Sequence, residues 1–125
     1  MPHIAAADAP KFQLHQAEFT GLAAPSRGAA ETAAWRVRIA PGSGPGVPHR
    51  LTREEILVAL TGRATARIGD AEHDFAAGDA IVVPPFTDFS LSNTGGEPFE
   101  AIAILPAGAR AMLADGSLFT PPWAA

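Results

Sequence analysis

Short apolar segments alternate with turn-forming residues along the whole chain. The clearest is residues 35–39, in which Trp, Val and Ile alternate with two Arg, so that one face of the segment is apolar and the other cationic. Strict alternation of this kind is typical of a half-buried β-strand. Twelve Gly and twelve Pro in 125 residues separate further segments of strand length. The pattern therefore predicts an all-β protein built of short strands.

The predicted strands are residues 12–15, 35–39, 47–51, 56–61, 63–68, 72–75, 80–83, 89–92 and 99–105. About eight strands make a double-sheet jelly roll, which is the fold that we expect. Ala107–Ala114 is the only helix candidate, because it is rich in Ala and ends at Asp115-Gly116. Pro121 and Pro122 predict an extended tail over residues 106–125, with Trp123 packed on the barrel or on a partner chain.

The composition narrows the class of protein. With 47% apolar and 18% charged residues, the chain is expected to fold as a single domain over residues 1–125. Its net charge of −4 argues against a nucleic-acid partner, and no apolar run approaches the roughly 20 residues of a membrane-spanning helix. The absence of Cys excludes a thiolate nucleophile and a Cys-ligated metal. The N-terminus lacks an export leader, so we expect a cytoplasmic protein.

His49 and Glu55 are the residues with candidate chemistry, and strand geometry indicates which side chains accompany them. Positions two apart in a strand lie on the same face. Positions 49 and 51 therefore share one face, positions 55 and 57 a second, and positions 89 and 91 a third.

The spacing of these residues resembles the two sequence motifs of the cupin superfamily. The first motif, over about residues 46–62, matches at His49, Glu55 and Gly62. The second motif, over about residues 78–93, matches at its Gly, Pro and Asn. The resemblance implies one cupin domain, whose fold is a jelly-roll barrel also called a double-stranded β-helix, and it implies that these three strand faces meet at one cavity.

The chain departs from the family pattern at three positions. Leu51 and Phe89 stand where the family has two of its His, and Phe86 stands where it has Gly. A complete site of the family presents three imidazoles and one carboxylate, a set that suits a divalent transition metal. Here His49 and Glu55 are the only ligands left if a metal binds. We therefore do not expect a tightly held transition metal, and the sequence leaves the identity of any cofactor unknown.

The leading hypothesis is a partly apolar pocket that binds a small organic molecule. Its expected lining residues are His49, Leu51, Glu55, Leu57, Phe89 and Leu91. His49 and Glu55 are expected to point into this cavity and to hydrogen-bond directly or through one water. Contact with the carboxylate favours a charged imidazole. The resemblance also implies a homodimer.

Two alternatives stay open. In the first, the chain is an enzyme: either a metal-dependent oxygenase or isomerase with substitute ligands, or a metal-free catalyst that uses His49 and Glu55 as acid and base. In the second, Phe86 and Phe89 fill the barrel, and the chain is a structural or interaction module. A pocket large enough for a ligand distinguishes the second alternative from the others.

Overall fold

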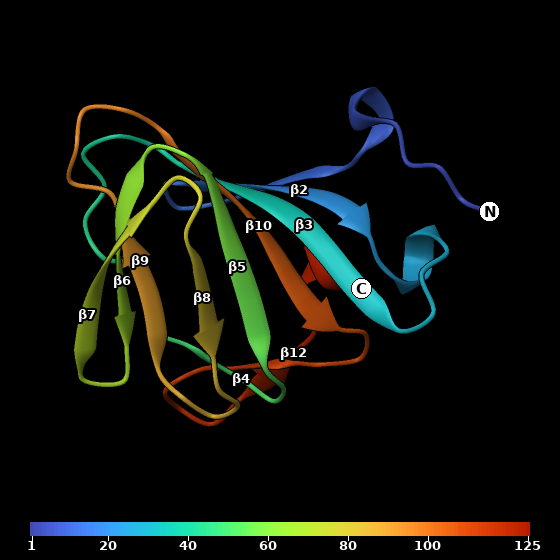
Figure 1. Cartoon of the computed structure of the whole chain (residues 1–125). Helices are drawn as coiled ribbons and strands as arrows, with labels where there is room; N and C mark the ends of the chain where they lie inside the picture. The colour runs from blue at the N-terminus through green and yellow to red at the C-terminus, as the bar shows by residue number, and fades with distance from the viewer.

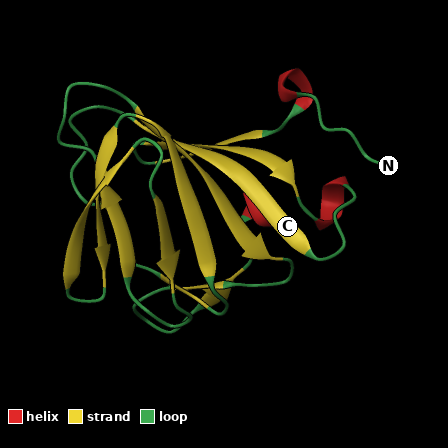
Figure 2. Cartoon of the chain, in the orientation of Figure 1, coloured by secondary structure: helices red, strands yellow, loops and turns green.

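The computed structural model describes residues 1–125 and consists almost entirely of β-strands (Figure 1 and Figure 2). The strands are β1 (Lys11–Leu14), β2 (Ala17–Ala23), β3 (Thr32–Ile39), β4 (Arg50–Leu51), β5 (Glu55–Thr61), β6 (Arg63–Ile68), β7 (Ala71–Ala76), β8 (Ala80–Val83), β9 (Phe89–Ser92), β10 (Phe99–Pro106), β11 (Ala111–Met112) and β12 (Leu118–Phe119). Three short 3-10 helices are η1 (Ala6–Asp8), η2 (Pro25–Arg27) and η3 (Pro122–Ala124). The predicted all-β fold is confirmed. None of the helices has the length and apolar character needed to span a membrane.

One wall of the barrel is a six-stranded antiparallel sheet in the order β1-β2-β3-β10-β5-β8, which we call the first sheet. Strand β3 contains the alternating segment predicted from the sequence, and Trp35, Val37 and Ile39 are buried on its inner face. Strand β10 pairs with β3 on one side and with β5 on the other. It therefore joins two parts of the chain that are far apart in sequence.

The opposite wall contains two smaller sheets, in the orders β7-β6-β9 and β12-β11-β4. A bridge between His49 and Phe89 connects them, because the segment before β4 bonds to the start of β9. We call this combined wall the second sheet. Two sheets that face each other in this way form a jelly roll.

A single hydrophobic core lies between the two sheets and contains 20 buried residues. Phe75 of β7 and Phe99 of β10 belong to opposite walls, and their ring centroids are 5.4 Å apart. Both side chains are almost completely buried. Aromatic contact across the interior therefore holds the two sheets together.

Two positions of the predicted motifs have clear structural roles. Gly62 has a φ of 78°, and a Cβ atom there would lie 2.3 Å from the carbonyl oxygen of Pro98, so no other residue fits without movement. Asn93 is buried and donates from Nδ2 to the carbonyl oxygens of Ile39 (3.1 Å) and Glu97 (2.8 Å). These contacts explain why the motif pattern has Gly and Asn at the two positions.

The helix predicted over Ala107–Ala114 is wrong. Gly108 adopts a φ of 85° in a turn, and the chain then forms β11, which pairs with β4. The backbone N–H of Arg110 donates to Oγ1 of Thr52, and the N–H of Thr52 donates to the carbonyl oxygen of Arg110, both at 2.9 Å. Strand pairing has overridden the local helix propensity of Ala.

The C-terminal residues pack beneath the N-terminal strands. The Trp123 ring stacks on Phe19 of β2 with centroids 3.8 Å apart and planes at 4°, so packing on the barrel is confirmed. Residues 122–124 form η3 where we expected an extended path.

Strand β2 was not predicted, because Gly21 interrupts its pattern. Its backbone lies against Arg27, whose guanidinium would be 2.7 Å from a Cβ at that position.

Candidate functional site

His49 lies immediately before β4 and faces the same side as Phe89. Its backbone N–H donates to the carbonyl oxygen of Phe89 at 3.1 Å, and the N–H of Phe89 donates back at 2.9 Å. Directly opposed residues in an antiparallel pair project to one face. The imidazole accordingly meets the Phe89 ring edge-on, with centroids 5.8 Å apart and planes at 70°.

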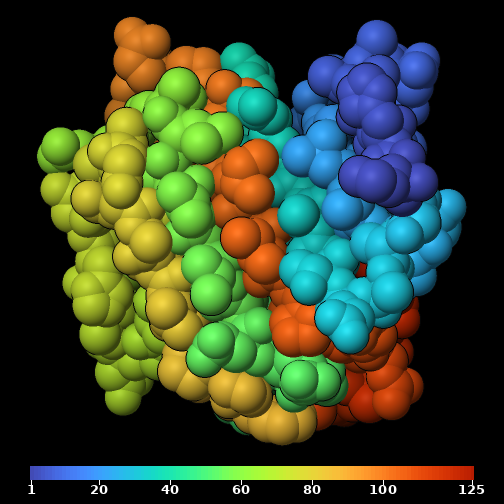
Figure 3. All heavy atoms as spheres, turned by 45° about the vertical axis from the view of Figure 1, so that its right-hand side comes forward, coloured from blue at the N-terminus to red at the C-terminus, as the bar shows by residue number.

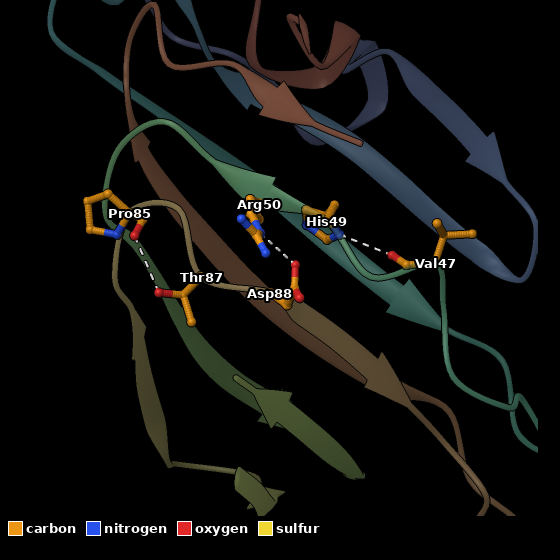
Figure 4. A network of polar contacts seen from close by, with 6 residues as sticks. All are labelled: Val47, His49, Arg50, Pro85, Thr87 and Asp88. Carbon is orange, nitrogen blue, oxygen red and sulfur yellow. Dashed lines mark hydrogen bonds and ion pairs between the residues drawn. The ribbon is translucent and has the colours of Figure 1, made fainter. Parts of the chain in front are cut away.

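A backbone contact sets the proton position on His49. Its Nδ1 lies 3.3 Å from the carbonyl oxygen of Val47 (Figure 4). Because a carbonyl oxygen only accepts, Nδ1 carries the proton and Nε2 is left as an acceptor. Burial lowers the pKa of His49, and the Val47 hydrogen bond and the Asp88 charge oppose this in part. A charged imidazole was expected only for contact with the Glu55 carboxylate, whereas burial favours the neutral imidazole.

Arg50 and Asp88 form an ion pair on the outer side of the same segment. Nε of Arg50 donates to Oδ1 of Asp88 at 2.8 Å, and both side chains are exposed (Figure 4). This contact joins the start of β4 to the loop before β9. It holds the pKa of Asp88 below its ordinary value, so the rim carries a charged carboxylate close to His49.

Glu55 begins β5 in the first sheet and lies on the inner face with Leu57 and Ala59. Its residue surface is only 4% exposed, yet its carboxyl group makes no hydrogen bond or ion pair with the protein. The two oxygens are not fully enclosed, since no completely buried side-chain oxygen is without a partner. Burial raises the pKa of Glu55 to about 8, so the group is mainly protonated at neutral pH.

No direct hydrogen bond or ion pair joins His49 to Glu55, and a contact through one water, the other form of the expectation, stays a prediction. The two groups belong to opposite sheets, whose separation is about 10 Å in packed β-proteins. Any link between them has to pass through a third molecule.

The apolar residues predicted to line the pocket lie in the barrel interior. Leu51, Leu57 and Phe89 belong to the hydrophobic core, and Leu91 packs against it half-buried. Phe89 is the one that touches His49. The alternation along the strands predicted that these side chains pack inside the barrel. A ligand cavity at these residues stays a prediction.

The donor set does not suit a tightly bound transition metal. Leu51 and Phe89 offer no lone pair, and only His49 and Glu55 remain of the family's ligand positions. No group of three or more His, Cys, Asp or Glu side chains with the spacing of a metal site occurs in residues 1–125. Transition-metal sites in proteins usually have three or four protein ligands. We therefore derive no chemistry through a metal.

Phe86 lies on the rim, whereas one of the alternatives above had it fill the barrel. It adopts a φ of 57°, in the left-handed region that bulky residues avoid, and the residue is 54% exposed instead of filling the barrel. Its N–H donates to the carbonyl oxygen of Leu51 at 2.8 Å, which fixes the loop. The sequence indicates this backbone conformation, because the cupin motif has Gly at this position and Gly adopts a positive φ readily.

Two open hollows occur elsewhere on the surface. One, of about 470 Å³, lies beside Gly62, Arg63 and Glu97. The other, of about 430 Å³, lies beside His73, Asp74 and Asp79. Neither includes a residue of the predicted pocket.

Three solved structures illustrate what this fold is similar to. The polyketide cyclase RemF from Streptomyces resistomycificus is 16% identical, with a TM-score of 0.77 over 87% of this chain and 81% of RemF. A vicilin from Solanum melongena, described with different anionic ligands in structurally similar pockets, is 17% identical, with a TM-score of 0.71 over 89% of this chain but only 34% of the vicilin. A predicted oxalate decarboxylase from Thermotoga maritima is 17% identical, with a TM-score of 0.68 over 84% and 98%. Likeness at such identities shows the fold alone.

The sequence itself places the chain in a family. No curated protein matches it, but the family model for the cupin domain matches residues 35–105. This range covers more than half of the chain and contains His49, Glu55, Gly62 and Asn93 at the positions that the motifs require. The match agrees with the two facing antiparallel sheets and with the cupin structures of similar fold. The chain is a small member of the cupin family.

Proposed function

We propose that this cupin binds a small organic molecule between its two sheets, without a tightly held transition metal. The ligand contacts the imidazole of His49 on one wall and the carboxyl group of Glu55 on the other. The rest of the proposed lining is apolar and consists of Leu51, Leu57, Phe89 and Leu91. A mostly apolar lining with a few polar groups is the usual composition of a small-molecule site.

The observation that carries this proposal is the environment of Glu55. A buried carboxyl group without a hydrogen bond costs free energy, and proteins seldom retain one without a use. Glu55 is buried, makes no polar contact with the protein, and keeps both oxygens incompletely enclosed. A ligand that accepts a hydrogen bond from the protonated carboxyl group would satisfy it. The vicilin of similar fold, described with anionic ligands in its pockets, supports the use of this fold for small ligands.

The second candidate is a metal-free enzyme that uses His49 as base and Glu55 as acid. The specific observation in its favour is that burial moves the two pKa values in opposite directions, lowering that of His49 and raising that of Glu55. At neutral pH this leaves a proton acceptor at Nε2 and a proton donor at the carboxyl group. Such a pair suits proton transfer on a bound molecule. Leu51 and Phe89 count against the metal-dependent version.

The proposal includes a homodimer in the cytoplasm, as expected from the sequence and from the family resemblance. It includes no nucleic-acid partner, since the net charge is −4 and the chain contains one Lys.

Elemental analysis of protein purified without a metal-affinity tag tests the absence of a tight metal. We expect much less than one equivalent of transition metal per chain. Stoichiometric metal that is lost on substitution of both His49 and Glu55 would overturn this part of the proposal.

Nuclear magnetic resonance of the imidazole groups tests ligand binding directly. Of the four His, only His49 is half-buried, so its ring signal reports on the barrel interior and the exposed His3, His15 and His73 act as internal controls. Titration with a panel of small carboxylic acids, phenols and ketones is expected to shift the His49 signal selectively.

Two variants of β5 provide a matched control. Leu57→Phe adds volume on the inner face and is expected to abolish the shift, whereas Leu60→Phe adds the same volume on the outer face and is expected to preserve it. Melting curves check that both variants fold. A panel that leaves His49 unperturbed, or a shift that survives Leu57→Phe, contradicts the proposal.

A further inference from the structure

His49 offers a hydrogen-bond acceptor to a ligand and no donor. Its Nδ1 proton is directed at the carbonyl oxygen of Val47, 3.3 Å away, so Nε2 is the ring nitrogen that is left for a ligand. An imidazole nitrogen without a proton only accepts hydrogen bonds. The group that contacts Nε2 therefore has to be a donor such as a hydroxyl group, because a ketone or ether oxygen at this point would have no partner.

Glu55 offers a donor from the opposite wall. The residue is 4% exposed, and no cation or N–H group of the protein contacts its carboxyl group. Burial without such a partner favours the protonated form of a carboxyl group. The O–H of Glu55 then needs an acceptor, and a carbonyl oxygen is the simplest uncharged one. The two walls thus ask for opposite polarity in the ligand.

Glu55 is reached only from inside the barrel, because the wall that carries it is closed. Strand β5 is hydrogen-bonded to β10 on one side and to β8 on the other. Figure 3 shows the outer side of this wall, where β8 in gold, β5 in green, β10 in orange and β3 in cyan lie side by side. A group that bonds to Glu55 therefore belongs to a molecule between the sheets, where Leu57 and Phe89 are buried. The body of that molecule has to be largely apolar.

The barrel interior contains no cation that could hold an anionic ligand. No Lys or Arg is among the buried residues. Arg50 at the rim is exposed and already donates to Oδ1 of Asp88 at 2.8 Å. The chain also carries a net charge of −4, which repels an anion. Because a buried anion without a cation loses its hydration and gains no ion pair, the site disfavours carboxylates and phosphates.

A cationic ligand is the main alternative, since an ammonium group can donate to Glu55 and the net charge of the chain is negative. Such a ligand would bury an ion pair, and the loss of hydration of both charges offsets much of their attraction. A carbonyl oxygen instead bonds to the carboxyl group in the form that burial already favours. The contacts therefore favour an uncharged ligand over an amine.

We propose that the ligand of this site is an uncharged hydroxy-carbonyl compound with an apolar body. Its hydroxyl group donates to Nε2 of His49, and its carbonyl oxygen accepts from the carboxyl group of Glu55. This class rests on the proposed function, because it is the class of molecule that the same site binds. The two ends of the ligand differ in polarity, so the bound molecule has one orientation, with its hydroxyl end toward the second sheet.

Dissociation constants from ligand-observed nuclear magnetic resonance test this class on the wild-type chain. The reference probe is 3- or 4-hydroxyacetophenone, whichever binds tighter, because the two isomers differ in the spacing of their oxygens. Acetophenone lacks the hydroxyl group and the matching ethylphenol lacks the carbonyl oxygen. Each is expected to bind about 10-fold more weakly, because it leaves one buried polar group without a partner. The matching hydroxybenzoate and hydroxybenzylamine carry an anion and a cation in place of the ketone, and a loss of roughly 10-fold or more is expected for both.

Variants on the two walls assign each preference to its residue. His49→Phe is expected to remove the preference for the hydroxyl group and to keep that for the carbonyl oxygen. Glu55→Leu is expected to do the reverse, whereas Glu55→Gln keeps both preferences, because its amide N–H donates in place of the carboxyl group. His73→Phe and Glu54→Leu, at exposed positions, are the matched controls and are expected to change neither preference. Melting curves check that each variant folds.

The outcomes separate this class from the proposed function itself. Equal affinities for the reference probe, acetophenone and ethylphenol overturn the hydroxy-carbonyl class and leave a small-molecule site in place. Tightest binding of the benzoate or the benzylamine overturns it in favour of a charged ligand. A preference that persists in the folded variant of its own wall, or is lost in a folded control, overturns the assignment to His49 and Glu55. Binding of none of the probes overturns the class, and the proposed function also fails only if the broader panel leaves His49 unperturbed.

Discussion

The two walls of the barrel surround their inner ionisable residues, His49 and Glu55, with different contacts. His49 in the second sheet donates a hydrogen bond to Val47, touches Phe89 and lies near the charged Asp88. Glu55 in the first sheet has no polar partner, and burial alone shifts its pKa. Both groups are neutral at pH 7, but the protein fixes the proton position on His49 and makes no hydrogen bond that fixes the one on Glu55. Of the two residues that match the motif, His49 is therefore oriented by the protein, whereas the carboxyl group of Glu55 has no partner within it.

The two shifts have opposite effects on stability as the pH changes. The pKa of Glu55 is raised in the folded state, so the stability that it contributes is present below its usual 4.5 and is lost as the pH rises toward about 8. The pKa of His49 is lowered, so its contribution is present above 6.5 and is lost as the pH falls through the folded value. Of these two groups, only Glu55 therefore makes the free energy of unfolding depend on pH above 6.5.

The largest expected effect is therefore that of Glu55→Gln, which removes the titrating group of the first sheet. The interval from 4.5 to about 8, at about 1.4 kcal/mol per pH unit, corresponds to a loss of roughly 5 kcal/mol in the wild-type chain. Urea unfolding between pH 6.5 and 8 is expected to show the upper part of this decline in the wild type and not in Glu55→Gln. Parallel curves for the two proteins would show that the carboxyl group is hydrated and ordinary.

A slightly smaller effect is expected from Phe89→Ala in the second sheet. The ring is 4% exposed and borders His49, and removing such a core aromatic costs about 3–5 kcal/mol. The loss of burial is also expected to move the pKa of His49 back toward 6.5, which a titration of its ring signal measures. The control is Leu57→Ala in the first sheet, with a cost of about 2–5 kcal/mol and no change at His49.

Leu51→His combined with Phe89→His restores the two His that the family motif has at these positions. Four donors then replace two, and we expect zinc affinity to rise 10- to 100-fold, as measured by calorimetry. Each single substitution serves as a control and is expected to give part of the gain. Unchanged affinity in the folded double variant would show that positions 51 and 89 do not face the same space as His49 and Glu55.

The smallest expected effect is that of Asp88→Asn, which changes only the rim. Its ion pair with Arg50 is exposed, so solvent screens the attraction and stability is expected to change little. The pKa of His49 is expected to fall slightly, because the Asp88 carboxylate currently raises it. A fall in the His49 pKa with stability nearly unchanged separates the electrostatic role of Asp88 from a structural one.

Local patterns predicted most of the strands but not every contact between them. Strands β6, β8 and β9 have the predicted limits. Gly and Pro mark the ends of β6 and β8, and polar and apolar residues alternate in β6 and β9. The segment at 107–114 was predicted wrongly, since its partner β4 lies far away in the sequence. Strand parity predicted that His49 and Glu55 face inward, but the separation of the two residues depends on the distance between the sheets, which no local pattern encodes.

The position of β10 has a consequence for the order of events during synthesis. It is the only strand that joins β3 to β5, and it ends 67 residues after β3 (106 minus 39). At about 5–20 residues per second, β3 waits roughly 3–13 s for this partner. Pairing between distant strands is also intrinsically slow. For several seconds, therefore, the growing chain has unpaired strand edges at which a neighbouring nascent chain competes with its own β10.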